Sequence, residues 1–223
     1  MITANDAATI DYKNELFRKG IHLCSLSIPV IYYFITRELA LKILIPLAVL
    51  STSIDLGRYY YKPLGDLFYS LFGFLLRNHE KDSVKKNLSG ATYVFLSAVL
   101  VILLFPKIFV ITGFATLIIG DLAAALIGRK FGKTKFLAKS LEGTAAFFVV
   151  GCIIVLLAPK LENNILEYII GFVAISLGAI VENISSSWAD DNLTVPVSIC
   201  LTMWILYSIL LPGMNLILLN TPL

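Results

Sequence analysis

Apolar residues occur along this chain in long runs that are separated by short polar stretches. The runs cover residues 20–36, 39–56, 90–106, 108–128, 143–158, 165–182 and 195–211. A membrane-spanning helix needs about 20 mostly apolar residues, with a lower limit near 17. The pattern therefore predicts an all-α, polytopic membrane bundle of about seven transmembrane helices.

A shorter segment, residues 64–76, alternates with helical periodicity between apolar and polar positions. Its leucines and Phe68 fall on one helical face, and polar residues such as Asp66 and Ser70 fall on the other. The segment is too short to cross a bilayer, so we expect one interfacial helix here.

Composition agrees with this pattern. The 223 residues are 58% hydrophobic and only 15% charged, whereas a soluble domain carries about 25% charged residues. The cysteines, Cys24, Cys152 and Cys200, are scattered through apolar runs, which indicates neither a disulfide framework nor a zinc site. We expect a single membrane domain over residues 1–223, with the first apolar run kept as an anchor because no small-residue cleavage site follows it.

The positive charges predict an orientation. Of the 18 Lys and Arg residues, all but Arg37, Lys42, Lys107 and Lys160 fall in residues 1–19, 57–89 and 129–142. Cytosolic loops carry the excess of Lys and Arg, so these three segments are predicted to be cytosolic. The loop at residues 183–194 then faces the same side, and we expect these segments together to form the active site.

One acid interrupts the run at 108–128. Asp121 lies where a carboxylate costs roughly 2.5–3.5 kcal/mol on insertion scales, so it needs a reason. The run is followed by the cations Arg129, Lys130, Lys133, Lys135 and Lys139. An acid that can hold a metal, next to a dense cationic loop, suits a bound polyphosphate. The alternative is an ordinary positive-inside loop.

Small residues recur in the same run at intervals of four: Gly120, Ala124, Gly128 and Gly132. Such a stripe lets a neighbouring helix approach closely, and it would also let a ligand approach the backbone. The sequence leaves both interpretations open.

Three other groups are candidates for the same site. Arg18, Lys19 and His22 can share a helical face, although they also suit a membrane anchor. Ser140 and Glu142 fit the start of a helix as cap and first-turn acid, where free N–H groups beside Lys139 could also hold a phosphate. The third group, Asp190, Asp191 and Asn192, fits either helix caps or ligands of a hard cation such as Mg²⁺. Glu182 precedes that group at the end of an apolar run.

The chain resembles the CTP-dependent lipid-alcohol kinases: dolichol and polyprenol kinase, phytol kinase and the fungal-type diacylglycerol kinase. The resemblance rests on Arg18-Lys19-Gly20-Ile21-His22, Asp55-Leu56-Gly57-Arg58, Arg77-Asn78-His79-Glu80, Leu88-Ser89-Gly90-Ala91-Thr92-Tyr93, Gly120-Asp121 through Lys135, Lys139-Ser140-Leu141-Glu142-Gly143-Thr144 and Asp190-Asp191-Asn192-Leu193-Thr194-Val195-Pro196. These pieces occur in the family's order over nearly the whole chain.

The resemblance implies transfer of the γ-phosphate of CTP to the hydroxyl of a membrane lipid, with Mg²⁺ as cofactor. Asp121, with Asp190 or Asp191, would bind the metal, and Arg18 and Lys19 match the family's basic pair. The nucleotide would be held by Gly120, Gly128, Arg129, Gly132, Lys133, Lys135, Lys139, Ser140, Glu142, Gly143 and Asn192. Asp190, Asp191 or His22 would accept the hydroxyl proton. We expect the bilayer, a lipid alcohol and a nucleoside triphosphate as partners, and no nucleic acid.

Two other functions fit the same residues. A cytidylyltransferase making a CDP-lipid from CTP and a phospholipid acid would also use a metal and acids near span ends. A transporter of an anionic lipid or a nucleotide is the second alternative, although no internal repeat is visible in the sequence.

Overall fold

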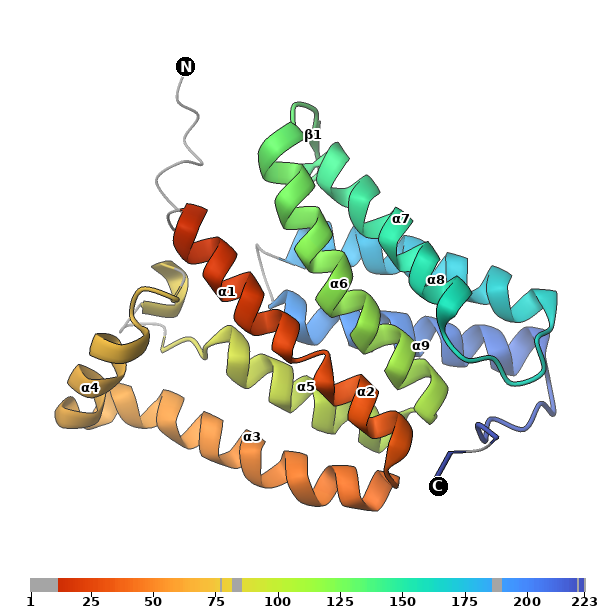
Figure 1. Ribbon diagram of the computed structural model, residues 1–223, viewed down its shortest axis with the longest axis horizontal. Coiled ribbons are helices and arrows are strands. Elements are labelled where there is room, and N and C mark those ends of the chain that lie inside the picture. The colour runs from red at the N-terminus through yellow and green to blue at the C-terminus, as the bar shows by residue number, and fades with distance from the viewer. Residues whose placement is uncertain (1–11, 77, 82–85, 186–189, 220, 223) are drawn as a thin grey trace.

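The computed structural model describes residues 12–76, 78–81, 86–185, 190–219 and 221–222. Over these residues the chain is a bundle of α-helices with one two-stranded hairpin (Figure 1). In chain order the elements are α1 (Tyr12–Cys24), α2 (Ser27–Phe34), α3 (Arg37–Tyr60), α4 (Lys62–Phe72), a 3₁₀ turn η2 (Asn78–Lys81), α5 (Gly90–Leu104), α6 (Lys107–Phe131), β1 (Lys135–Phe136), β2 (Lys139–Ser140), α7 (Leu141–Leu157), α8 (Ile165–Ser185) and α9 (Asp191–Leu210). The predicted all-α class is confirmed.

Four of the described helices, α3, α6, α8 and α9, are long and apolar enough to cross a membrane. Helices α5 and α7 are also apolar but contain only 15 and 17 residues. The predicted run at 90–106 was longer than α5 because it included two residues beyond the helix end, whereas the run at 143–158 began two residues after the start of α7 and ended one residue beyond its last residue. The chain is therefore a polytopic membrane protein, and the count of about seven spans stays a prediction.

The first apolar run, residues 20–36, is divided between two helices. Pro29 has no N–H to donate to the carbonyl of Ser25, which removes a helical hydrogen bond at this point. The amide of Ile28 bonds to that carbonyl instead, at 2.9 Å. The chain therefore breaks between α1 and α2, and both helices lie along α6 (Figure 1).

Helix α6 lies at the centre of the bundle (Figure 1). It packs against α1, α2, α5, α7 and α9, and a larger share of it is buried than of the other long apolar helices that the structure describes. Helices α3 and α4 lie on one side of it, while α7 and α8 lie on the other (Figure 1). Any residue on the inner faces of α6 can therefore meet side chains from several distant parts of the chain.

The small-residue stripe of α6 faces α7. A Cβ added at Gly120 would lie 2.9 Å from the ring of Phe147, and one at Gly128 would lie 3.4 Å from the Cα of Gly143. A Cβ at Gly132 would meet the Ser140 side chain at 2.8 Å. The stripe thus lets α6 and α7 approach closely, as in small-xxx-small packing. Nucleotide contact with these glycines stays a prediction.

The amphipathic segment is helical, as predicted, but α4 runs from Lys62 to Phe72 and not over residues 64–76. Pro63 favours this earlier start, because proline suits the first turn of a helix. Leu67, Leu71 and Phe72 are exposed on its surface. Helix α4 packs beside the end of α3, and its apolar face is available to the membrane interface.

Candidate active site

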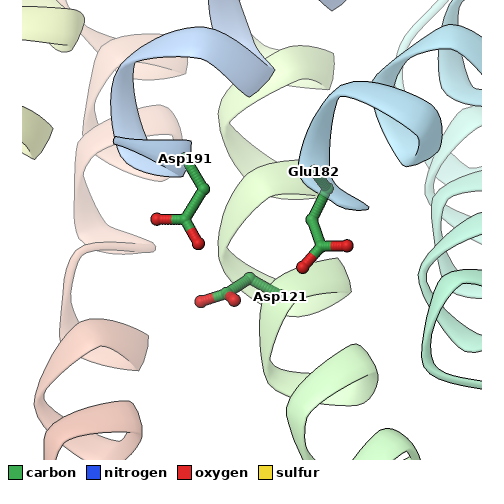
Figure 2. Close-up of side chains that lie close together, drawn as sticks. All are labelled: Asp121, Glu182 and Asp191. Carbon is green, nitrogen blue, oxygen red and sulfur yellow. The ribbon is translucent and has the colours of Figure 1, made fainter. Parts of the chain in front are cut away.

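Three buried carboxylates meet near one end of the bundle. Asp121 comes from the middle of α6, Glu182 from the last turn of α8 and Asp191 from the first turn of α9. Each offers an oxygen atom, and these atoms all lie within 4.8 Å of one another. Figure 2 shows the three carboxylates pointing toward a common point. The acids are 6%, 2% and 4% exposed, respectively.

Two lysines border these acids. Lys19 of α1, itself buried, donates a hydrogen bond to Oδ2 of Asp121. Lys139 of β2 donates one to Oε1 of Glu182, and its Nζ lies 3.9 Å from Oδ2 of Asp191. We call these five residues, Lys19, Asp121, Lys139, Glu182 and Asp191, the acid cluster. Its members come from five elements spread over residues 19–191.

The two lysines differ in their access to solvent. The side chain of Lys19 is 3% exposed, whereas that of Lys139 is 31% exposed. Burial disfavours the charged form of Lys139, but the carboxylates of Glu182 and Asp191 outweigh burial and raise the pKa of Lys139. Lys139 is therefore charged at neutral pH and stands at the open edge of the acid cluster.

His22 lies one turn after Lys19 on α1. Its Nε2 is 3.8 Å from Oδ2 of Asp121, which is beyond hydrogen-bond distance. This nitrogen is buried and makes no hydrogen bond with any residue that the structure describes. Lys19 and His22, which the sequence indicates as candidates on one helical face, both lie beside Asp121 in the structure.

A short hairpin fixes the position of Lys139. Strands β1 and β2 are antiparallel, with Lys135 opposite Ser140. The side-chain oxygen of Asn183, next to Glu182 on α8, accepts hydrogen bonds from the amides of Ala138 and Lys139 at 2.8 and 3.1 Å. Asn183 also donates to Thr144 Oγ1 at 2.6 Å. Helix α8 therefore supplies both an acid of the cluster and the support for the lysine that pairs with it.

Ser140 and Glu142 have structural partners in the same region. Ser140 Oγ accepts a hydrogen bond from the amide of Gly143 at 3.2 Å, so it is the N-cap of α7, as predicted. The Glu142 carboxylate accepts a bond from the amide of Thr134, at 3.0 Å to its Oε1. These contacts hold the hairpin against the start of α7, and direct contact of Ser140 or Glu142 with a nucleotide stays a prediction.

The other cations of the predicted loop lie outside the acid cluster. Arg129 and Lys130 are at the end of α6, and Lys133 and Lys135 are at the start of the hairpin, and all four are exposed. Their predicted contact with a nucleotide stays a prediction.

Asp190 and Asn192 are the neighbours of Asp191 in the sequence, but they bond to each other. Asp190 Oδ1 accepts hydrogen bonds from the backbone amide and the side chain of Asn192, at 3.0 and 2.8 Å, and caps α9. Among the described residues, the acids that could hold a metal ion are Asp121, Glu182 and Asp191. Glu182, and not Asp190, therefore joins the other two. The sequence had placed Glu182 before a loop, but α8 continues through Ser185 and keeps it inside a helix.

A second buried polar network lies beside the first. Asp55 of α3 accepts hydrogen bonds through Oδ2 from the amide and hydroxyl of Ser89 and from Thr92 Oγ1, at 2.8, 2.7 and 2.6 Å. Arg58 donates to the carbonyls of Glu80 and Asn87, each at 3.0 Å. These bonds tie the segment before α5 to α3.

Gly90 joins the two networks. A Cβ added there would lie 3.1 Å from Asn192 Nδ2, 3.6 Å from Glu80 Oε1 and 4.0 Å from a guanidinium nitrogen of Arg18. Arg18 and Asn192 therefore stand between the acid cluster and the Asp55 network. Arg77 and residues 186–189, which flank these segments, lie outside the described residues.

Replacing Asp55 by Ala is expected to lower the free energy of unfolding by about 3–5 kcal/mol, because buried Arg58 would lose its carboxylate partner 3.4 Å away. Ser53, which is exposed on the same helix, gives the control: Ser53→Ala should change stability by less than about 0.5 kcal/mol. Unfolding of both variants in detergent micelles measures the difference. Equal stability of the two variants would show that the Asp55 network does not hold this part of the fold.

Comparison with known proteins identifies a relative but assigns no activity. No family model and no solved structure matches the chain. An uncharacterized protein of Rickettsia prowazekii (strain Madrid E) is 30% identical over 196 residues, which cover 87% of this chain and 95% of the Rickettsia protein. Matching over nearly the full length of both chains indicates one common fold. The chain therefore belongs to the same protein family as this Rickettsia protein.

Proposed function

We propose that this protein is a membrane kinase that transfers the γ-phosphate of CTP, or of another nucleoside triphosphate, to the hydroxyl of a membrane lipid alcohol. Polyprenols, phytol and diacylglycerol are the acceptors that the sequence resemblance suggests. The observation that carries the proposal is the acid cluster, in which three buried carboxylates and two lysines meet within a membrane bundle. Ionisable residues at such depth are expensive and commonly functional.

The carboxylates suit a divalent cation. With all three ionised, Asp121, Glu182 and Asp191 carry one negative charge more than Lys19 and Lys139 neutralise. Oε2 of Glu182 is buried and accepts no hydrogen bond from any described residue. Carboxylate oxygens are the ligands that Mg²⁺ prefers, together with phosphate oxygens and water. Mg²⁺ held here would neutralise charge on the phosphates of the nucleotide.

Lys139 is the residue that we assign to the transferred phosphate. It is charged, partly exposed and held in place by Asn183, so it can stabilise negative charge that develops during transfer without prior rearrangement. Lys133, Lys135 and Arg129 provide the positive surface over which the nucleotide would approach. Phosphoryl transfer depends mainly on such positioning and charge neutralisation.

His22 is the proton acceptor that we propose for the lipid hydroxyl. Its Nε2 makes no hydrogen bond with a described residue and lies beside Asp121, whereas Asp190 is engaged in capping α9. The hydroxyl oxygen would form a bond to the γ-phosphorus as the bond to the β-phosphate oxygen breaks. The hydroxyl proton would pass to His22, and CDP would leave.

The proposal includes a topology. Helices α1 and α2 together, and the short helices α5 and α7, would cross the bilayer beside the four long apolar helices, which gives the predicted count of about seven spans. The Lys and Arg distribution supports an orientation in which the acid cluster and the hairpin would lie at the cytosolic side, where the nucleotide is found.

The test uses the purified protein in vesicles of total membrane lipid, with Mg²⁺ and with CTP labelled at either the α- or the γ-phosphate. We expect label to enter lipid only from the γ-position and to stop when Mg²⁺ is chelated. Label entering from the α-position would identify a cytidylyltransferase. Absence of label from CTP and from ATP, with folded protein, would contradict both enzymes and favour transport.

A further inference from the structure

An apolar groove runs between α2 and α6, where the two helices pack side by side (Figure 1). Its volume is about 210 Å³. The groove is lined mainly by Leu26, Pro29, Val30 and Tyr33 of the α2 segment and by Ile111 and Ala115 of α6. The hydroxyl of Tyr33 is the one polar side-chain group among these six residues, so the groove suits a hydrocarbon ligand.

The groove opens toward the bilayer. Val30 and Phe34, which belong to its α2 wall, are 51% and 68% exposed on the outside of the bundle. The wall on α6 belongs to the apolar part of a helix that can cross the membrane. A lipid chain can therefore enter sideways without leaving the hydrocarbon region.

Along the chain, the groove residues nearest to the acid cluster are Ala115 on α6 and Leu26 before α2. Ala115 precedes Asp121 by six residues, which corresponds to about 9 Å along α6 at 1.5 Å per residue. On the opposite wall, His22 precedes Leu26 by four residues across the turn between α1 and α2, and its Nε2 lies 3.8 Å from Oδ2 of Asp121. A molecule whose chain fills the groove and extends past Leu26 would bring its polar end toward His22.

We propose that the groove binds the hydrocarbon chain of the lipid alcohol and directs its hydroxyl to His22. This inference rests on the proposed kinase function, because it names where that substrate lies. The groove volume of about 210 Å³ and its apolar lining suit one hydrocarbon chain.

The groove also assigns roles in substrate selection. Ala115 leaves the space that the chain occupies, so a larger side chain there blocks the groove from the α6 side. Val30 stands at the open rim and controls access from the bilayer. Both residues are outside the acid cluster, and changing them leaves the proposed phosphate-transfer groups in place.

The experiment uses a long-chain primary alcohol with a diazirine at its chain end, reconstituted with the intact protein in phosphatidylcholine vesicles. We expect light-induced labelling of groove residues on α2 and α6, with competition by unlabelled phytol or polyprenol. Ala115→Phe and Val30→Trp should each reduce this labelling about tenfold or more, because overpacking excludes the chain. Ala145→Phe, at an exposed site of α7 outside the groove, is the matched control and should retain it.

The outcomes separate this inference from the proposed function. Competed labelling of the groove without γ-phosphate transfer would support the groove and contradict the kinase. Phosphate transfer with labelling outside the groove, or with undiminished labelling of a folded Val30→Trp protein, would contradict lipid binding in the groove but not the kinase function. Equal labelling of the same residues by a photoreactive phosphatidylcholine, without competition by the alcohols, would identify a general lipid contact and overturn the inference.

Discussion

Asp121→Asn is expected to reduce lipid phosphorylation by at least about 10²–10³-fold, the loss typical of removing one charge-stabilising group from an active site. The substitution keeps the size of the side chain but removes one of the charges that the acid cluster offers to Mg²⁺. Glu182→Gln and Asp191→Asn should have effects of the same order, because their oxygens lie within 4.8 Å of those of Asp121. Transfer of labelled γ-phosphate from CTP to lipid measures all three variants.

Asp190→Asn is the matched control for this series. Asparagine caps a helix about as well as aspartate, and Asp190 is engaged with the amide and side chain of Asn192. Activity should therefore stay near that of the unmodified protein. A folded Asp121→Asn protein with ordinary activity would remove the metal assignment. A loss in Asp190→Asn equal to that in Asp191→Asn would mean that the metal ligands are not the three acids proposed above.

Lys19→Met is expected to lower the free energy of unfolding by about 3–5 kcal/mol in the absence of Mg²⁺, because it leaves the buried Asp121 carboxylate without its ammonium partner. The double variant Lys19→Met/Asp121→Asn should regain most of this stability, since neither charge remains. It should not regain activity. Unfolding in detergent micelles, with each single variant and the pair, gives the coupling energy between the two residues.

Mg²⁺ turns the same experiment into a test of the metal site. Ligand binding to the folded state stabilises it, so Mg²⁺ should raise the melting temperature of the Lys19→Met protein more than that of the unmodified protein, in which Lys19 competes for Asp121. Lys42→Met, which removes an exposed lysine paired with Glu38, should change stability by at most about 1 kcal/mol. No response to Mg²⁺ in any variant would indicate that the acid cluster is a structural ion-pair network.

The sequence predicted the helical class and several members of the site for physical reasons that are local. Asp121 was identified because a carboxylate inside an apolar run is costly, and Lys19, His22 and Lys139 because they adjoin the same predicted membrane face. Their meeting with Asp121 follows from the packing of α1 and the hairpin around α6. Helix periodicity can indicate which residues share a helical face, but it cannot give the distances between residues of different helices.

The roles of Glu182 and Asp190 could not be predicted from the sequence. Glu182 ends a predicted apolar run, next to a predicted loop, and its approach to Asp121 depends on how α8 packs beside α7 and α9. Asp190 and Asp191 are adjacent, and only the residue at which α9 begins decides which carboxylate caps the helix and which turns inward. A proline inside an apolar run does not by itself reveal a helix break, since the run with Pro29 is divided into α1 and α2 whereas Pro46 lies inside the continuous helix α3.

The order of the acid cluster along the chain bears on biosynthesis. Lys19 is synthesised before Asp121, and Lys139 is synthesised before Glu182 and Asp191. A nascent chain entering the bilayer from its N-terminus therefore has a cation available before each acid arrives, since Lys19 pairs with Asp121 and Lys139 with Glu182. The insertion cost of Asp121 and of Glu182 can thus be offset as their helices enter, and the polar centre is complete when α9 joins the bundle.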